Sequence, residues 1–117
     1  MIFSIQSTLS AIKAFEDKMG VTANNIANAE TEEFKKSRVT LNEGPDKTVS
    51  ARITQSETPG PVVAEATGGQ SASKELSNVD LAEEIPQTIL AQRGYEANLS
   101  TVRVQDDMSK SVIDIIK

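Results

Sequence analysis

A long apolar stripe in the C-terminal third of the chain limits the possible folds more than any other feature. It begins with Leu81, Ile85 and Ile89, and its further members follow mostly at intervals of three and four: Gln92, Tyr95, Leu99, Val102, Met108, Val112, Ile115 and Ile116. This spacing predicts one amphipathic helix over residues 78–117. Such a helix is about 50 Å long, which is more than a small globule can cover. We therefore expect a partner helix.

Three features qualify this helix. Asp80 followed by Glu83 predicts a capping box at its start. Pro86 lacks the N–H that a second turn needs, which predicts either a kink or a helix that becomes regular only after it. Gly94 is either a tolerated defect or a point where a second helix approaches closely.

The partner is predicted at the N-terminus, over residues 2–29. Isoleucines and a methionine recur there seven residues apart, at Ile5, Ile12, Met19 and Ile26, which indicates a coiled-coil or amphipathic core helix. With Ile26 placed near Ile85 and equal rise on both sides, an antiparallel hairpin follows. The predicted neighbours are Ile12 and Leu99, Met19 and Gln92, and Gly20 and Gly94.

The middle of the chain predicts a small β-hairpin and a linker. Val39 and Leu41 alternate with period two, as do Val49, Ala51 and Ile53, on either side of a Gly-Pro-Asp turn. Residues 62–64 are compatible with a short extended piece, and the Gly- and Ser-rich residues 65–77 predict a flexible linker. The expected architecture is mainly α: one domain, 1–117, with a helix over 2–29, a loop and hairpin over 34–64, a linker over 65–77 and a helix over 78–117.

Composition excludes several classes of function. The chain has 117 residues with 3% aromatics, which disfavours a large globular core. Its net charge of −5 argues against nucleic acid and anionic lipid as partners. It contains no cysteine and no histidine, which removes disulfides, the commonest metal ligand and the commonest general base. We expect no catalytic, cofactor or metal site, since the carboxylates also lack EF-hand spacing. An enzyme is the least supported class.

The first residues and the hydropathy of the chain bear on whether it carries a signal peptide or a membrane span. The first residues have neither a basic region nor an apolar run, so no cleavable signal peptide is expected. No stretch has the apolar length of a membrane span, so no direct membrane insertion is expected.

An asparagine cluster ends the first helix. Asn24, Asn25 and Asn28 stand within five residues, although asparagine is a poor helix former. A frayed helix end explains one of them, whereas three predict amides that bond to a following turn or to a partner subunit. Phe34 is expected to fold back on the helix end.

These ends resemble the axial proteins of the bacterial flagellum, the rod and hook family. The run from Ala23 to Thr31, followed by Phe34 and Lys35, is similar to the family's N-terminal signature, and residues 77–84 and 92–98 are similar to its C-terminal signature. Glu33 stands where the family usually has Gly, which predicts a different turn because Glu takes a positive φ less easily. The motif residues are Asn24, Asn25, Ile26, Asn28, Phe34, Lys35, Ser77, Asn78, Val79, Asp80, Gln92, Gly94, Tyr95 and Asn98.

The resemblance implies a structural role. The terminal helices would pair as an antiparallel coiled coil in the rod of the basal body, and the partners would be other axial subunits and further copies of the chain. Export would use the flagellar type III apparatus without a cleaved signal. The short middle is most like a small proximal-rod protein, either a standard component or a divergent paralogue. The alternative is a soluble coiled-coil adaptor or export chaperone for axial subunits, which would not polymerise.

Overall fold

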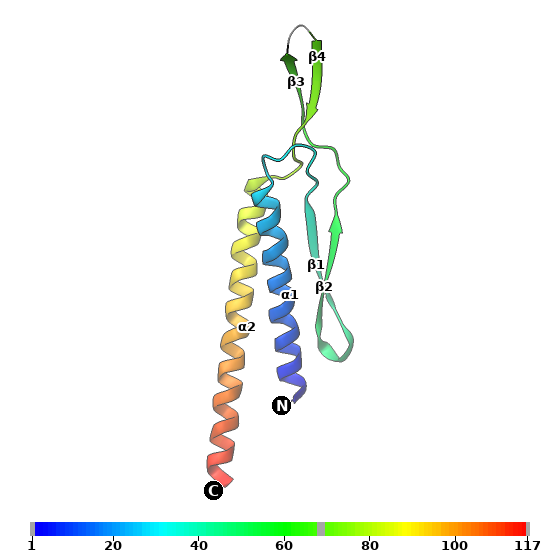
Figure 1. The fold of residues 1–117 in the computed structure, drawn as a ribbon. Coiled ribbons are helices and arrows are strands. Elements are labelled where there is room, and N and C mark those ends of the chain that lie inside the picture. The colour runs from blue at the N-terminus through cyan, green and yellow to red at the C-terminus, as the bar shows by residue number, and fades with distance from the viewer. Residues whose placement is uncertain (1, 68–69, 117) are drawn as a thin grey trace.

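The computed structural model describes residues 2–67 and 70–116. Within these ranges two α-helices, α1 (Ile2–Ala27) and α2 (Leu81–Ile116), run antiparallel and side by side (Figure 1). Both chain ends lie at the same end of the molecule (Figure 1). The shape is a rod with extents of 85 × 23 × 15 Å. The long helix that the apolar stripe predicts is therefore present, and it has a partner.

The start of α2 follows its sequence. Asp80 is the N-cap, because its Oδ1 accepts the Ala82 N–H at 2.9 Å and its carbonyl accepts the Glu84 N–H at 3.0 Å. The Glu83 carboxylate pairs instead with Lys36, so the return bond of a capping box is replaced by an ion pair. The helix begins ahead of Pro86 and continues through it. A helix that becomes regular only after Pro86 is thus wrong.

The surface where the two helices touch, called the helix seam below, is built from small residues. Ala91 is fully buried, and Ala14 is 2% exposed. Opposite Phe15, a Cβ on Gly94 would lie 2.5 Å from the ring atoms Cε1 and Cζ. Gly94 therefore marks a close approach of the two helices, as one of its two readings predicts. The expected neighbour is wrong, however, because a Cβ on Gly20 would meet nothing within 4 Å.

The register of the helix pair differs from the prediction by two residues. In the predicted register Glu84 lies opposite Ala27, whereas its Oε2 accepts a hydrogen bond from Asn25 at 3.1 Å. Gly94 lies opposite Asp17 in the same prediction, and it faces Phe15 instead. The reason is that small side chains determine where the helices can approach, whereas the prediction aligned large ones.

The heptad residues of α1 lie at partly exposed positions. Ile12, Met19 and Ile26 are half-buried, and Ile5 is 40% exposed. The fully buried positions of α1 belong mostly to small or polar residues: Thr8, Ala11, Ala14, Thr22 and Asn25. An antiparallel helix pair is present, and the knobs-into-holes packing of a coiled coil stays a prediction.

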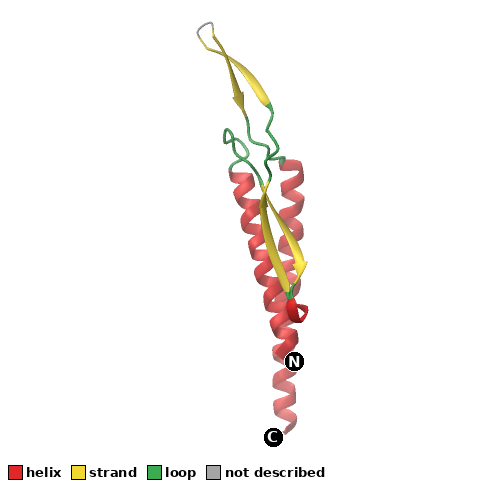
Figure 2. Cartoon of the chain, turned by 90° about the vertical axis from the view of Figure 1, so that its right-hand side faces the viewer, coloured by secondary structure: helices red, strands yellow, loops and turns green. Residues whose placement is uncertain are grey.

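The first hairpin lies along α1 and confirms the period-two pattern. Strands β1 (Ser37–Glu43) and β2 (Val49–Gln55) pair antiparallel around a short 3₁₀ turn, Pro45–Lys47. Figure 2 looks onto this hairpin, which lies against the helices. Two serines of α1 hold its turn: Ser7 Oγ donates to the Lys47 carbonyl at 2.7 Å, and Ser10 Oγ accepts the Val49 N–H at 2.9 Å.

A second hairpin corrects the linker prediction. Strands β3 (Val62–Thr67) and β4 (Gln70–Glu75) pair antiparallel with Val62 opposite Glu75, and they project beyond the helix pair (Figure 1). The extended residues 62–64 are confirmed as part of β3. The two strands are paired by backbone hydrogen bonds and carry no alternating apolar pattern. Their amino-acid composition therefore resembles that of a linker. Gly68 and Gly69, assigned to the linker, lie outside the described residues.

Candidate assembly interface

The end of α1, the start of β1 and the start of α2 meet at a polar junction, which we define as Asn25, Lys36, Ser37, Arg38, Asn78, Glu83 and Glu84. Asn25, at the end of α1, is 1% exposed. Its Oδ1 accepts the Ser37 N–H at 3.0 Å, and its Nδ2 donates to the Ser37 carbonyl at 2.8 Å. The same Nδ2 donates to Glu84 Oε2 at 3.1 Å. One buried amide therefore ties α1 to the first residue of β1 and to the first turn of α2.

Glu84 brings a carboxylate into this buried position. It is 1% exposed, and its Oε1 lies 3.4 Å from Arg38 Nη1. That oxygen accepts no hydrogen bond within the described part of the chain, so the Arg38 cation is its main compensation. A buried carboxylate without a cation or donors is strongly unfavourable. The buried Glu84 carboxylate on α2 therefore needs the Arg38 guanidinium of β1 beside it.

Glu83, its neighbour, is in a different environment. Its side chain is 47% exposed and pairs with Lys36 Nζ at 3.0 Å and with Arg38. The hydrogen bond from Lys36, followed by that from Arg38, lowers the pKa of Glu83 below its usual value. Because water also solvates Glu83, its ion pairs with Lys36 and Arg38 stabilise the fold less than their geometry suggests.

Asn78 completes the junction from the C-terminal side. Its N–H donates to the Phe34 carbonyl at 3.2 Å, and its Oδ1 accepts the Lys36 N–H at 2.6 Å. Its Nδ2 donates to the Thr58 carbonyl at 2.8 Å. The residues after the first sequence motif and those at the start of the second are therefore hydrogen-bonded to each other, about forty positions apart in sequence.

Glu75 fixes the base of the second hairpin beside the junction. Its Oε1 accepts the Gly60 N–H at 2.7 Å and pairs with Lys35. The hydrogen bond from Lys35, followed by that from Gly60, lowers the pKa of Glu75. A Cβ on Gly60 would lie 1.9 Å from the Leu76 carbonyl oxygen, so only glycine fits there.

The turn that leads into the junction keeps an unusual backbone. Glu33 has φ of 56°, and its N–H donates to the Glu75 carbonyl at 3.1 Å. The prediction that a glutamate here changes the turn is wrong in this respect, because Glu33 adopts the left-handed conformation that favours glycine.

The other part of the C-terminal motif lies elsewhere. Gly94 faces Phe15 in the helix seam. Asn98 Nδ2 donates to the Gly94 carbonyl at 2.8 Å, and Gln92 Nε2 donates to Glu96 at 2.9 Å. The predicted motif residues thus fall into two groups. One group is at or near the junction: Asn24, Asn25, Ile26, Asn28, Phe34, Lys35, Ser77, Asn78, Val79 and Asp80. The other is midway along α2: Gln92, Gly94, Tyr95 and Asn98.

The predicted motif residues also differ in how far they are exposed to solvent. Asn25 and Ser77 are buried, whereas Asn24, Asp80 and Gln92 are exposed. Asn28 bonds locally, with its Nδ2 donating to the Asn24 carbonyl at 2.9 Å. The other motif residues are half-buried: Ile26, Phe34, Lys35, Asn78, Val79, Gly94, Tyr95 and Asn98.

Sequence reasoning missed Arg38 and the buried role of Glu84. Glu84 is one of two acidic residues in the first turn of α2, a position that the helix dipole alone would explain. Its position one heptad before Ala91 is a usable signal, because both residues then lie on the face of α2 that enters the helix seam. No comparable signal marks Arg38, whose partner depends on how the hairpin is placed.

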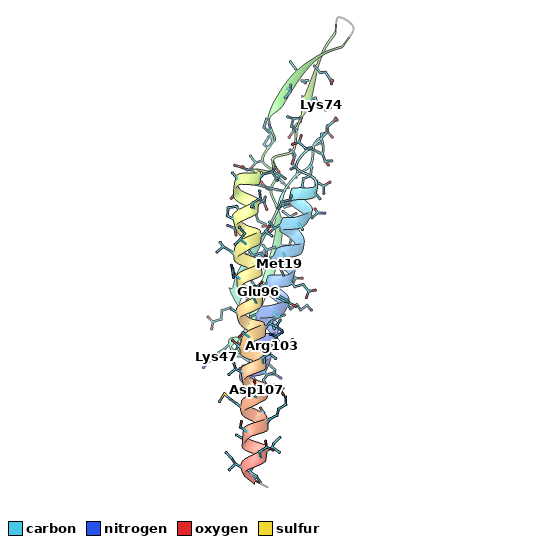
Figure 3. The ribbon with its side chains drawn as sticks, turned by 90° about the vertical axis from the view of Figure 1, so that its left-hand side faces the viewer. Met19, Lys47, Lys74, Glu96, Arg103 and Asp107 are labelled. Carbon is cyan, nitrogen blue, oxygen red and sulfur yellow. The ribbon has the colours of Figure 1, made fainter. Side chains whose placement is uncertain are left out.

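The outer surface of α2 carries large apolar side chains that are exposed. Ile85 is 51% exposed, Ile89 is 54% exposed and Met108 is 59% exposed. The helix also continues past the start of α1 at the end where both termini lie (Figure 1). A charged side of the same helix shows Glu96, Arg103 and Asp107 (Figure 3). We define the exposed apolar surface of α2 as Leu81, Ile85, Ile89, Leu90, Val104, Met108, Val112, Ile113, Ile115 and Ile116.

The described residues also bear on two other kinds of site. They contain no group of three or more acidic, histidine or cysteine side chains arranged to hold a metal ion. Neither α1 nor α2, as far as the structure describes them, combines the length and hydropathy of a membrane-crossing helix.

Comparison with known proteins accounts for both ends of the chain. Residues 5–35 match the family model of flagella basal body rod proteins, and residues 70–115 match the C-terminal model of flagellar basal body rod FlgEFG proteins. The chain belongs to the flagellar rod and hook axial family. The two matches of this axial protein include most of α1 and α2, together with Asn25, Asn78, Glu83 and Glu84 of the junction.

Individual relatives agree. The axial chain is 38% identical over 76 residues to the flagellar basal-body rod protein FlgG of Bacillus subtilis, which covers 65% of this chain and 25% of FlgG. It is 39% identical over 41 residues to the flagellar hook protein FlgE of Escherichia coli, covering 35% of this chain and 10% of FlgE. The flagellar hook protein FlgE of Salmonella typhimurium matches with the same values. The chain thus aligns with a quarter or less of the length of these relatives.

Proposed function

We propose that this chain is a structural subunit of the flagellar basal body rod that assembles with other axial subunits and with itself through α1 and α2. The observation that carries the proposal is the exposed apolar surface of α2. Its side chains include Ile85 and Ile89, both more than half exposed, on a chain whose helix seam uses alanine and glycine. The names of the relatives, a rod protein and a hook protein, support the same role.

Burial of the exposed apolar side chains of α2 would stabilise an assembly of subunits. Full burial of an Ile, Leu, Val or Met side chain stabilises by about 1.5–3 kcal/mol. In the single chain part of this free energy is unused along α2, because side chains such as Ile85, Ile89 and Met108 are more than half exposed. Large apolar side chains that stay exposed, here near the start of α2 and again from Val104 to Ile116, are typical of a protein interaction site. A helix from another subunit is the occupant that fits a long, straight surface.

The motif residues divide into two proposed roles. The buried Asn25 and Ser77 hold the junction and act on assembly through its shape. The exposed Asn24 and Gln92 are proposed to contact neighbouring subunits directly. A catalytic role forms no part of the proposal.

Location and export are part of the same proposal. The chain would reach the periplasm-spanning rod through the flagellar type III export apparatus. Its net charge of −5 supports protein partners rather than nucleic acid.

Cysteine labelling of basal bodies tests the proposal. The chain contains no cysteine, so an Ile89→Cys variant carries a single thiol. We expect the variant to co-purify with basal bodies and its thiol to react with maleimide in the free chain but not in the assembled rod. The control is Glu65→Cys on β3, which is exposed and lies away from α2, and which should react in both states. A chain found only in soluble complexes with axial subunits would instead indicate the adaptor or chaperone.

A further inference from the structure

The buried carboxylate of Glu84 links three elements that could otherwise fold separately. It is 1% exposed and lies on the seam-facing side of α2. It accepts a hydrogen bond from Asn25 of α1 at 3.1 Å and lies 3.4 Å from the Arg38 guanidinium of β1. The helix seam beside it consists of residues as small as Ala91 and Gly94, which gain little from burial.

We propose that Glu84 makes the pairing of α2 with α1 conditional on the docking of β1, so that the first hairpin acts as a latch on the helix pair. The cation that compensates Glu84 is on the hairpin and not on either helix. If β1 is not docked, a closed helix seam leaves Glu84 against α1 with one amide donor and no cation. That state is strongly unfavourable. The helices then stay open until Arg38 arrives.

Asn25 also makes the pairing of the helices depend on the docking of β1. Its amide bonds to the backbone of Ser37 on both sides, at 3.0 and 2.8 Å, and Ser37 is the residue before Arg38. Docking of β1 therefore gives the buried Asn25 amide its hydrogen-bond partners and places the Arg38 cation next to Glu84 in one step. The turn of the hairpin is held separately by Ser7 and Ser10 of α1.

Glu83 supplies an internal control. It also pairs with Arg38, but its side chain is 47% exposed and it keeps Lys36 at 3.0 Å. Loss of Arg38 leaves Glu83 solvated and paired, whereas Glu84 becomes buried without a cation. A latch of the proposed kind depends on Glu84 alone.

The experiment measures helix pairing directly. Spin labels on Ala23→Cys of α1 and Arg93→Cys of α2, both at exposed sites, report the separation of the two helices in the otherwise complete chain. We expect Arg38→Met to lower the ratio of paired to open molecules at least tenfold. Arg52→Met on β2 is the matched control, since Arg52 is exposed and makes no ion pair within the described residues. It should change the ratio less than twofold.

Rescue decides between a latch and a general loss of stability. In the Arg38→Met background, Glu84→Gln should restore the paired state to within about twofold, because a neutral amide needs no cation. Glu83→Gln in the same background should restore nothing. The proposal is overturned if Arg38→Met leaves the distance distribution unchanged, or if Glu83→Gln rescues as well as Glu84→Gln. If Arg38→Met alone does not fold, a folded Arg38→Met/Glu84→Gln chain with paired helices supports the latch, and an unfolded one overturns it. Since the measurement is made on the single chain, it is independent of the proposed assembly.

Discussion

Gly94 of α2 lies directly against the ring of Phe15 of α1 in the helix seam. A Cβ built on Gly94 would be 2.5 Å from Cε1 and Cζ of that ring. No real Cβ occupies such a position without movement of one helix or of the ring. This contact and the Asn25–Glu84 hydrogen bond define one common register for the pair.

A larger side chain at Gly94 should therefore destabilise the chain. We expect Gly94→Leu to lower the free energy of unfolding by about 1–3 kcal/mol through overpacking, despite its better helix propensity. Gly20→Ala is the matched control, because its Cβ meets nothing within 4 Å. It should raise the free energy of unfolding by about 0.5–1 kcal/mol. Urea denaturation measures both, and a Gly94→Leu chain as stable as the unchanged one would contradict the contact.

The two adjacent asparagines should differ sharply. Asn25→Leu leaves the Ser37 N–H without its acceptor and Glu84 without its amide donor, so a loss of more than about 2 kcal/mol is expected. Asn24 is exposed, and Asn24→Leu should change the free energy of unfolding by less than about 0.5 kcal/mol. Equal effects of the two substitutions on the urea midpoint would mean that the buried network contributes little.

Glu33→Gly should stabilise the turn after α1. A left-handed backbone costs a non-glycine residue about 1–2 kcal/mol, and Glu33 has φ of 56°. Part of this gain is lost to the greater freedom of glycine in the unfolded chain, so a net increase of about 0.5–1 kcal/mol is expected. Glu33→Ala removes the same carboxylate and keeps the strain. A thermal unfolding scan in which the Gly and Ala variants have equal midpoints would rule the strain out.

Acid should open the junction. The pKa values of Glu83 and Glu75 are lowered in the folded chain, chiefly by hydrogen bonds from Lys36 and Lys35. The unfolded chain then binds more protons in acid, so stability is fully present above the ordinary carboxyl pKa of 4.5. It is lost as pH falls through the folded pKa. Urea unfolding from pH 7 to pH 3 should show this decline, and it should be shallower in Glu83→Gln and in Lys36→Met. Curves parallel to that of the unchanged chain would contradict the assignment.

Isolated chains should be less ordered at the helix ends than assembled ones. The exposed apolar surface of α2 is uncovered in the single chain, so amides in residues 5–19 and 99–113 should exchange fast in a dilute monomer. The exchange should slow as concentration rises and the chains associate. Strong protection in a verified monomer would show that the helix pair is self-sufficient.

The sequence predicts the elements of this fold better than their contacts. Two long helices follow from period and length, and the N-cap at Asp80 follows from residue type, because both depend on local interactions. The first hairpin follows from alternating Val39, Leu41 and Ile53. The second hairpin does not, since Gln70–Glu75 holds its partner through the backbone and carries no apolar alternation.

The candidate site is predictable only in part. The asparagine cluster indicated amides that bond to the segment after the helix, and Asn25 bonds to Ser37 and Asn28 to Thr31. Which residues they meet depends on the register of the helix pair, and that register depends on Gly94 and Ala91 rather than on the large apolar residues. The Arg38–Glu84 pair joins residues from different elements, so no local rule identifies it.

The rod shape has a consequence for how the molecule behaves in solution. Its radius of gyration is 21.1 Å, whereas a compact domain of this length has about 13 Å. A 12.6 kDa chain of this form experiences far more friction than a sphere of equal mass. On a sizing column it should elute early, at the position of a globular protein several times its mass. Early elution is therefore no sign of self-association for this chain, and its oligomeric state has to be measured by light scattering or sedimentation equilibrium, which report mass independently of shape.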